Sequence, residues 1–282
     1  MEPLTIARTI GFDFGGLLGG NIVPELKIAV SLNCLGMPIK KALHTVAQLG
    51  ASGIEIDARN GLRPSEISDT GRRQLRKMLT DLNLTVAAIR FPTRRGYDVL
   101  QDLDRRLEAT KEAMGFAYSL GANVVINSAG YVPEDNQHSA YSQLTASLSE
   151  LARHGERVGA ILSCETGAEP TSRLAELLGN INSGSIGIHF NPANLIMADL
   201  YDRESIRSCV SLVRSVTVRD AVRDLAQRRG VEVEIGRGSA EFPEILGVLE
   251  EQGYRGWFII DRPPTNRTLI EVENAISLLK SF

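Results

Sequence analysis

The sequence predicts a single closed (β/α)8 barrel, or TIM barrel, with a short N-terminal extension, and three observations lead to this fold class. Eight short β-rich runs alternate with amphipathic helical stretches, a pattern typical of parallel βαβ units. No linker-like break divides the 282 residues, a length that such barrels reach as one domain. Several predicted helices end in a glycine that is followed closely by a strand. An open, doubly wound sheet is the structural alternative.

Apolar and β-branched residues define the predicted strands. In chain order these are residues 27–32, 53–57, 86–91, 123–127, 160–165, 185–191, 215–219 and 256–261. Amphipathic stretches such as "PIKKALHTVAQLG" and "SQLTASLSELARHGERVG" fill the intervals and predict helices. In "LGASGIEI", "LGANVVI" and "QGYRGWFII" a glycine stands where the helix should end in a left-handed conformation.

The first 26 residues precede the first predicted strand, so we divide the chain into an extension, 1–26, and a barrel, 27–282. The glycine-dense stretch "GFDFGGLLGG" lies before a strand instead of after one, so it does not fit a dinucleotide-binding loop. We expect the extension to cap one end of the barrel or to reach a neighbouring subunit. A homodimer is therefore left open.

Composition excludes several classes of protein. The 31 basic residues nearly balance the 34 acidic ones, so no nucleic-acid-binding surface is expected. No apolar run approaches the roughly 18 residues that a membrane span needs, and the N-terminus lacks the pattern of a signal peptide. Three scattered cysteines suit a reducing compartment. We expect a cytoplasmic protein that binds neither nucleic acid nor membrane.

Polar residues recur where the predicted strands end. Residues two apart share one face of a strand, and a barrel carries its site at the carboxyl ends of its strands. This parity sends one set of polar side chains into the same end of the barrel, namely Glu55, Glu165, His189, Asn191, Thr217 and Asp261. Buried carboxylates need partners, so the set is either a binding site or a polar network that closes the barrel.

Four segments, "CETGAEP", "GIHFNPAN", "VTVRDA" and "IGRGSAEFPEILGVLEEQGYRGWFIIDR", resemble the sugar phosphate isomerase/epimerase family. This family belongs to the xylose isomerase-like barrel superfamily, which also includes endonuclease IV. The resemblance implies a divalent metal, manganese, magnesium or zinc, at the barrel mouth. It also implies isomerisation or epimerisation of a small sugar or polyol derivative.

The metal ligands that the resemblance implies are incomplete in this chain. Glu165 matches the family's glutamate on the fifth strand, and Asp261 stands where the eighth strand usually ends in glutamate. Asn191 and Asn194 replace an aspartate and a histidine, and Thr217 replaces a second histidine. An amide has lost the carboxylate's charge and a threonine the imidazole nitrogen, so affinity for a divalent ion should fall. The resulting degenerate site would consist of Glu165, Asn191 and Asp261.

We expect an enzyme in which Glu165 and Asp261 form an acid/base pair for proton transfer next to a carbonyl group. Guanidinium groups suit a phosphate or carboxylate on the substrate. The predicted substrate-binding residues are Glu55, Arg90, His189, Asn191, Asn194, Thr217, Arg219 and Arg237. The alternative is a catalytically silent or metal-independent barrel that binds a sugar-like ligand. A nuclease of the endonuclease IV kind is disfavoured, because its metal cluster needs more ligands than four histidines supply.

Overall fold

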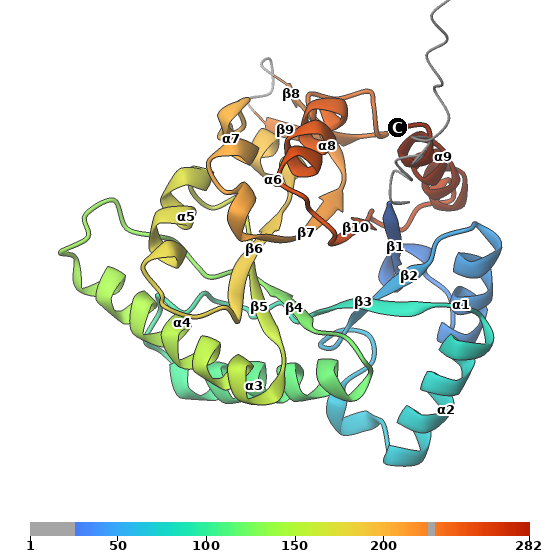
Figure 1. Ribbon diagram of the computed structural model, residues 1–282, viewed down its shortest axis with the longest axis horizontal. Helices are drawn as coiled ribbons and strands as arrows, with labels where there is room; N and C mark the ends of the chain where they lie inside the picture. Colours follow the sequence, from blue (N-terminus) through green and yellow to red (C-terminus); the bar gives the residue numbers. More distant parts are fainter. Residues whose placement is uncertain (1–25, 225–228) are drawn as a thin grey trace, which may run out of the picture.

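The computed structural model describes residues 26–224 and 229–282 and shows a closed barrel of parallel strands, as predicted (Figure 1). Around the ring the strand order is β1-β10-β7-β6-β5-β4-β3-β2, and each neighbouring pair is parallel. The doubly wound alternative is thereby wrong. The expectations for the extension concern residues 1–26, of which 1–25 lie outside the described part of the chain.

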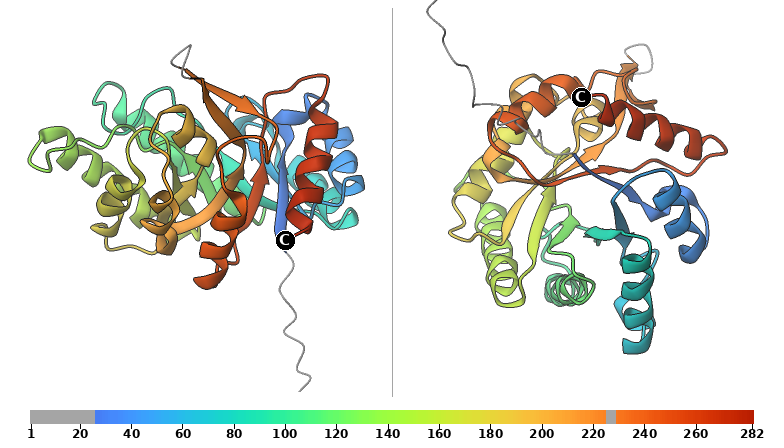
Figure 2. Two further views of the ribbon diagram at one scale, coloured as in Figure 1. Left: turned by 90° about the horizontal axis from the view of Figure 1, so that it is seen from above. Right: turned by 45° about the vertical axis from the view of Figure 1, so that its right-hand side comes forward.

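The predicted strand segments match the barrel strands to within two residues at each end. The strands are β1 (Lys27–Ser31), β2 (Gly53–Asp57), β3 (Thr85–Arg90), β4 (Val124–Asn127), β5 (Ile161–Glu165), β6 (Ile186–Phe190), β7 (Val213–Val218) and β10 (Trp257–Ile260). Helices on the outside of the ring are α1 (Ile39–Gln48), α2 (Asp69–Asp81), α3 (Leu103–Ser119), α4 (Ser139–Val158), α5 (Thr171–Gly179), α6 (Pro192–Met197), α7 (Glu204–Arg207), α8 (Phe242–Glu251) and α9 (Thr268–Lys280) (Figure 2).

The glycines that were predicted to end three helices do adopt the left-handed conformation. Gly50, Gly121 and Gly253 follow α1, α3 and α8 with φ angles of 77°, 80° and 66°. A side chain would be strained at these angles, so glycine lets the chain turn directly into the next strand. This local chemistry sets the repeating helix-to-strand connection that builds the barrel.

Apolar side chains fill two separate layers. The larger layer lies between the strands and the surrounding helices. A smaller cluster of Ala29, Ala87, Ala88, Val124, Ile126 and Ile259 fills part of the barrel interior, where small residues suit the confined space. Among the described residues, no helix combines the length and the apolar character needed to cross a bilayer.

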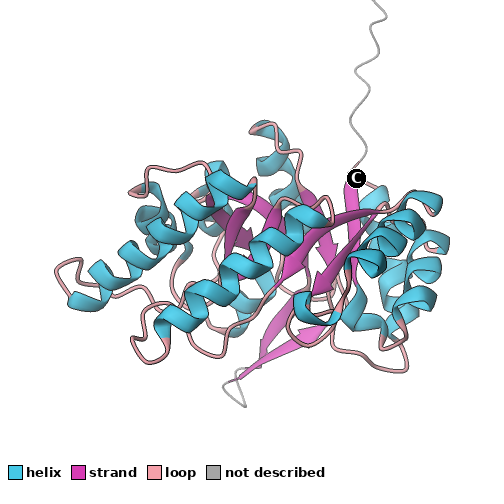
Figure 3. Cartoon of the chain, turned by 90° about the horizontal axis from the view of Figure 1, so that it is seen from below, coloured by secondary structure: helices cyan, strands magenta, loops and turns pink. Residues whose placement is uncertain are grey.

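An antiparallel hairpin that the sequence analysis did not predict follows β7. It consists of β8 (Asp220–Asp224) and β9 (Arg229–Val233) and projects from one end of the barrel (Figure 3). The hairpin packs against α6 so closely that a Cβ atom on Gly230 would lie 2.3 Å from the Cα atom of Met197. Because the hairpin starts where β7 ends, it stands at the carboxyl end of the strands.

A cavity lies at the opposite end of the barrel, away from the polar strand ends. It measures about 540 Å³ and is lined mainly by apolar side chains, among them Leu246, Leu249, Tyr254 and Phe258. In a barrel of this kind the carboxyl ends of the strands carry the chemistry, and the opposite face serves stability. The polar strand ends are therefore the candidate functional site.

Candidate functional site

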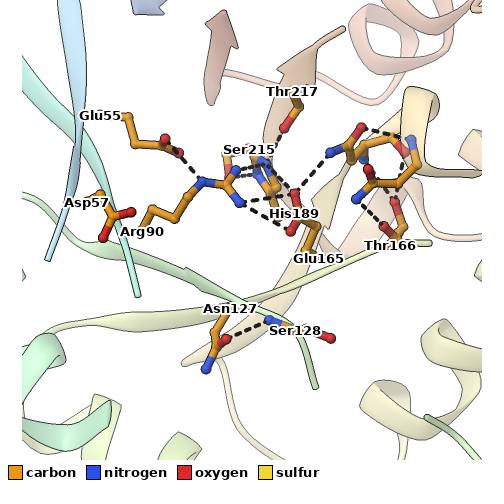
Figure 4. Close-up of polar contacts among 12 residues, drawn as sticks. Glu55, Asp57, Arg90, Asn127, Ser128, Glu165, Thr166, His189, Ser215 and Thr217 are labelled. Atoms are coloured by element: carbon orange, nitrogen blue, oxygen red, sulfur yellow. Dashed lines mark hydrogen bonds and ion pairs between the residues drawn. The ribbon is translucent and has the colours of Figure 1, made fainter. Parts of the chain in front are cut away.

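Arg90, at the end of β3, is the centre of the polar cluster at the barrel mouth (Figure 4). Its Nε atom donates a hydrogen bond to Oε1 of Glu55 at 3.1 Å. Its Nη1 atom lies 3.2 Å from both carboxylate oxygens of Glu165, and its Nη2 atom lies 3.5 Å from Nε2 of His189. The side chain thus reaches from β2 on one side of the mouth to β5 and β6 on the other. It retains an exposed fraction of 16%.

Asn191 connects Glu165 to the beginning of α6. Its Oδ1 atom accepts a hydrogen bond from the backbone N–H of Asn194 at 3.2 Å, which caps the helix. Its Nδ2 atom donates to Oε1 of Glu165 at 3.0 Å. The two partners leave one orientation for the amide, because a carboxylate needs a donor and a backbone N–H needs an acceptor. The N–H side of the amide therefore faces the carboxylate.

His189 is fully buried next to this pair and binds two hydroxyl groups of β7. Its Nδ1 atom lies 2.7 Å from Oγ of Ser215, and its Nε2 atom contacts Oγ1 of Thr217. Burial lowers the pKa of His189 to about 3, so the imidazole is neutral near pH 7. With Arg90 donating to Nε2, the ring proton belongs on Nδ1, from which it reaches Ser215.

The pKa values of the two carboxylates that contact Arg90 are shifted in opposite directions, downward for Glu165 and upward for Glu55. Burial alone would raise the pKa of Glu165, but the charge of Arg90, aided by His189 and Asn191, lowers it to about 2. Complete burial raises the pKa of Glu55 above its ordinary value, and the nearby charge of Asp261 adds to that rise. Burial works against the charge of Arg90, yet Glu165, Glu55 and Asp261 together hold its pKa well above the usual range. Arg90 is therefore a permanent cation.

Asp261 follows β10 and is half-buried at the mouth. It lies near enough to Arg90 and Glu55 to influence the pKa of each. Among the described residues, none donates a hydrogen bond to its carboxylate or forms an ion pair with it. Asp261 is thus the carboxylate of this cluster that is free to meet a ligand.

Asp220 has a structural role that parity alone did not reveal. Its fully buried carboxylate accepts hydrogen bonds from the backbone N–H groups of Gly236, Gly238 and Ala240 at 3.0, 2.8 and 2.9 Å. The loop approaches so closely that a Cβ atom on Gly238 would lie 2.0 Å from Oδ1 of Asp220. The Gly-x-Gly segment is therefore built around this carboxylate.

Six of the predicted site residues come together at the mouth, and three do not join Arg90. The cluster contains Glu55, Arg90, Glu165, His189, Asn191 and Thr217, with Asp261 beside it. Asn194 donates to the backbone oxygen of Thr166 at 3.3 Å, and Arg219 pairs with Glu232 of the hairpin. Arg237 is 76% exposed and lies 3.5 Å from Glu234. Ser215 was missed, although it shares strand parity with Thr217 and could have been found that way.

The residues at the mouth do not fit a divalent metal. Asn191 turns its amide hydrogens, not its oxygen, toward Glu165, and Thr217 is engaged with His189. The guanidinium of Arg90 already lies against both oxygens of Glu165, where a second cation would be repelled. Within 26–224 and 229–282 there is no group of three or more His, Cys, Asp or Glu side chains placed to hold a metal ion.

This mouth belongs to a closed barrel with polar groups at the carboxyl ends of its strands, the arrangement of a ligand-binding or catalytic (β/α)8 protein. The family model described as "Xylose isomerase-like TIM barrel" matches residues 43–281. The chain therefore belongs to the xylose isomerase-like TIM barrel family. No curated protein matches the chain.

Solved structures of the same fold cover almost the whole chain. A xylose isomerase domain protein from Planctomyces limnophilus is 25% identical, covers 92% of this chain and 97% of its own, and has a TM-score of 0.80. D-Psicose 3-epimerase with D-tagatose, from Clostridium cellulolyticum H10, is 14% identical over 91% and 99% of the two chains, with a TM-score of 0.74. A xylose isomerase-like TIM barrel protein from Mycobacterium smegmatis in complex with magnesium is 18% identical over 90% and 96%, with a TM-score of 0.72.

Proposed function

We propose that this protein binds a small polyhydroxylated carbonyl compound, a sugar or polyol derivative, at the carboxyl end of its barrel and isomerises or epimerises it. The observation that carries the proposal is the half-buried Asp261 carboxylate, without a partner among the described residues, beside the permanent cation of Arg90. A proton acceptor next to a donor for an oxyanion is what proton transfer beside a carbonyl group requires. The similarity to structures of sugar epimerases supports the choice of substrate class.

The proposed reaction needs only proton transfer. Asp261 takes the proton from the carbon next to the carbonyl group, and the electrons of that C–H bond form the C=C bond of an enediolate. The carbonyl oxygen gains the negative charge and accepts a hydrogen bond from Arg90. A proton from solvent, delivered to the other face of the same carbon, completes epimerisation. Return of the proton to the neighbouring carbon, together with transfer of the hydroxyl proton to the enediolate oxygen, completes isomerisation. Near neutral pH Glu165, with a pKa of about 2, serves as the charged partner of Arg90 and as an acceptor for substrate hydroxyls.

The remaining residues hold these groups in place. His189, neutral and buried, fixes the Thr217 hydroxyl and one edge of the Arg90 guanidinium. Asn191 holds Glu165 while it caps α6. A guanidinium has five N–H donors, and the four contacts of Arg90 with Glu55, Glu165 and His189 use four at the most. At least one donor therefore remains for the substrate oxygen.

The first test is exchange of the substrate's carbon-bound proton with solvent. We expect that ketopentoses or ketohexoses, free or phosphorylated, gain deuterium beside the carbonyl group when incubated with the protein in D2O. The Asp261→Asn variant should exchange about 100-fold more slowly, because an amide is a poor base. Proton NMR of the sugars measures the rate, and Asp81→Asn on the exposed end of α2 is the matched control.

A catalytically silent, ligand-binding barrel is the second candidate function. It is favoured by the firm hold of Arg90 and Asn191 on Glu165, which makes this carboxylate a weak base. Calorimetric binding of a sugar without any deuterium incorporation would support it over the enzyme. A chain that neither binds nor exchanges any member of the sugar panel would contradict both candidates.

A further inference from the structure

We propose that Arg90 replaces the divalent metal as the resident cation of the barrel mouth, and that removing its charge turns the mouth into a metal site. The inference concerns a different property from the proposed reaction, although its meaning for catalysis rests on that proposed function. It starts from the disagreement between a family resemblance that implies a metal and a set of side chains that does not fit one.

The contacts of Arg90 are those of a cation at the centre of an anionic site. Its guanidinium meets Glu55 at 3.1 Å and both oxygens of Glu165 at 3.2 Å, and Asp261 lies within electrostatic reach. These three carboxylates come from β2, β5 and the end of β10, on different sides of the ring. A charge that draws together carboxylates from separate strands does the same electrostatic work as a bound metal ion.

The side chains around the guanidinium are also adapted to a donor instead of a metal. His189 offers Nε2 to Arg90 at 3.5 Å, and Thr217 contacts the same nitrogen. Asn191 donates to Glu165 and uses its oxygen to cap α6, so that it adds a second hydrogen-bond donor where a ligand would supply a lone pair. An aspartate at 191 would instead set a further negative charge next to Glu165.

The inference predicts that the positive charge of Arg90, more than the lost ligands, excludes a metal. Without it, Glu55, Glu165 and Asp261 are left as mutually repelling carboxylates, and hard divalent ions favour such oxygen donors. His189 stands beside them, with its Nε2 atom 3.9 Å from Oε1 of Glu165, and would supply an imidazole nitrogen. In the present structure these described side chains are too far apart to hold a metal ion together, so binding requires them to move inward once the guanidinium is gone; they would then offer donor atoms that manganese accepts.

The test is manganese binding by four forms of the full chain, namely the wild type, Arg90→Met, Asn191→Asp and the double variant. Methionine keeps an unbranched apolar side chain close to the length of arginine's aliphatic stem and removes the charged guanidinium. Calorimetry and the electron paramagnetic resonance signal of free Mn²⁺ measure binding, with metal raised to roughly 1 mM, the weak limit for protein sites of hard cations. Arg237→Met, which removes a 76% exposed arginine, is the control.

We expect no saturable binding by the wild type, Asn191→Asp or Arg237→Met. Arg90→Met should bind one Mn²⁺ with a dissociation constant at least about tenfold below the upper metal concentration of the titration, and the double variant should bind it more tightly still. Stoichiometric binding by the wild type, or by Asn191→Asp to the same degree as by the double variant, would overturn the proposal. So would a folded Arg90→Met that does not bind. If Arg90→Met folds only when manganese is added, the proposal is supported. If it stays unfolded with manganese, the result for Asn191→Asp decides: stoichiometric manganese binding by that variant would overturn the proposal, and the absence of binding would support it.

This experiment uses no sugar, so its outcome is independent of the D2O exchange test. If the wild type exchanges no sugar proton but the four forms bind manganese as expected, only the proposed reaction is refuted. If the wild type exchanges the sugar proton and also binds stoichiometric manganese, only the role of Arg90 as a replacement for the metal is refuted.

Discussion

Replacing Asp220 by alanine is expected to lower the free energy of unfolding by about 3–5 kcal/mol, since several buried backbone donors lose a charged acceptor at once. The carboxylate accepts from three N–H groups of the Gly236–Ala240 loop and from the N–H of Ala221 at 2.8 Å. The loop should lose its conformation while the barrel strands persist.

Urea denaturation measures this loss, and hydrogen exchange at the Gly236 and Gly238 amides locates it. Asp220→Asn should fall between alanine and wild type, because its single remaining oxygen still accepts while its NH2 group faces other donors. Asp81→Ala, which removes an exposed carboxylate paired with Lys77 at 2.8 Å, should change stability by less than about 1 kcal/mol. If Asp220→Ala also lost less than about 1 kcal/mol, water would be satisfying the backbone N–H groups of the loop, and the loop conformation would not depend on the carboxylate.

Replacing His189 by glutamine is expected to remove much of the protein's sensitivity to acid. An unfolded histidine takes up a proton near pH 6.5, whereas the folded His189 does so only near pH 3. Between these values the unfolded chain binds more protons, so the stability that neutral His189 provides is present above pH 6.5 and is lost as the pH falls. At pH 4 the loss amounts to roughly 3 kcal/mol, from 1.4 kcal/mol per pKa unit.

Unfolding free energies at pH 7, 5.5 and 4.5 test this prediction. At pH 7 the glutamine variant should be less stable than the wild type, because it fits the Ser215 and Thr217 hydroxyls less well. The difference should shrink as the pH is lowered, because only the wild type loses the stability that comes from keeping His189 unprotonated in the folded state. His44→Gln on the exposed side of α1 should keep the wild-type slope. Parallel pH profiles for the wild type and His189→Gln would contradict the burial of a neutral histidine.

Below pH 4.5 a second loss should follow in both proteins. The pKa of Glu165 lies near 2 in the folded chain, against an ordinary 4.5, so the stability gained from its ionised form disappears as the pH falls through this range. The His189→Gln comparison is therefore best made above pH 4.5, where Glu165 remains ionised in both states.

The barrel itself was determined by local features of the sequence. Apolar runs at regular intervals predicted the strands, and Gly50, Gly121 and Gly253 marked where helices end, because their left-handed angles exclude most side chains. Strand parity placed Glu165, His189 and Thr217 on the inner face, since successive side chains alternate between the two faces of a strand. These are short-range rules, so a single sequence was enough.

The same short-range rules did not predict the hairpin. After the buried Asp220 and Ala221, the residues of β8 and β9 are half-buried or exposed, so they lack the clear apolar alternation that identifies a strand. Its place is set instead by α6 and by Arg262, which bonds the backbone oxygen of Val233 at 2.7 Å and lies 2.9 Å from Glu271 of α9. Such contacts join segments that are far apart in the chain.

Strand parity in the sequence by itself placed most of the polar cluster at the barrel mouth, although it missed Ser215. The predicted site also included Asn194, Arg219 and Arg237, which do not join the cluster. Only the tertiary structure decided what the side chains at the mouth do there. Closure of the ring brings Arg90 of β3 within 3.2 Å of Glu165 on β5, 75 residues further along the chain. The same closure buries His189 as a neutral base and turns the hydrogens of Asn191 toward Glu165. Charge pairing, burial and amide orientation depend on distances across the barrel, which no local pattern contains.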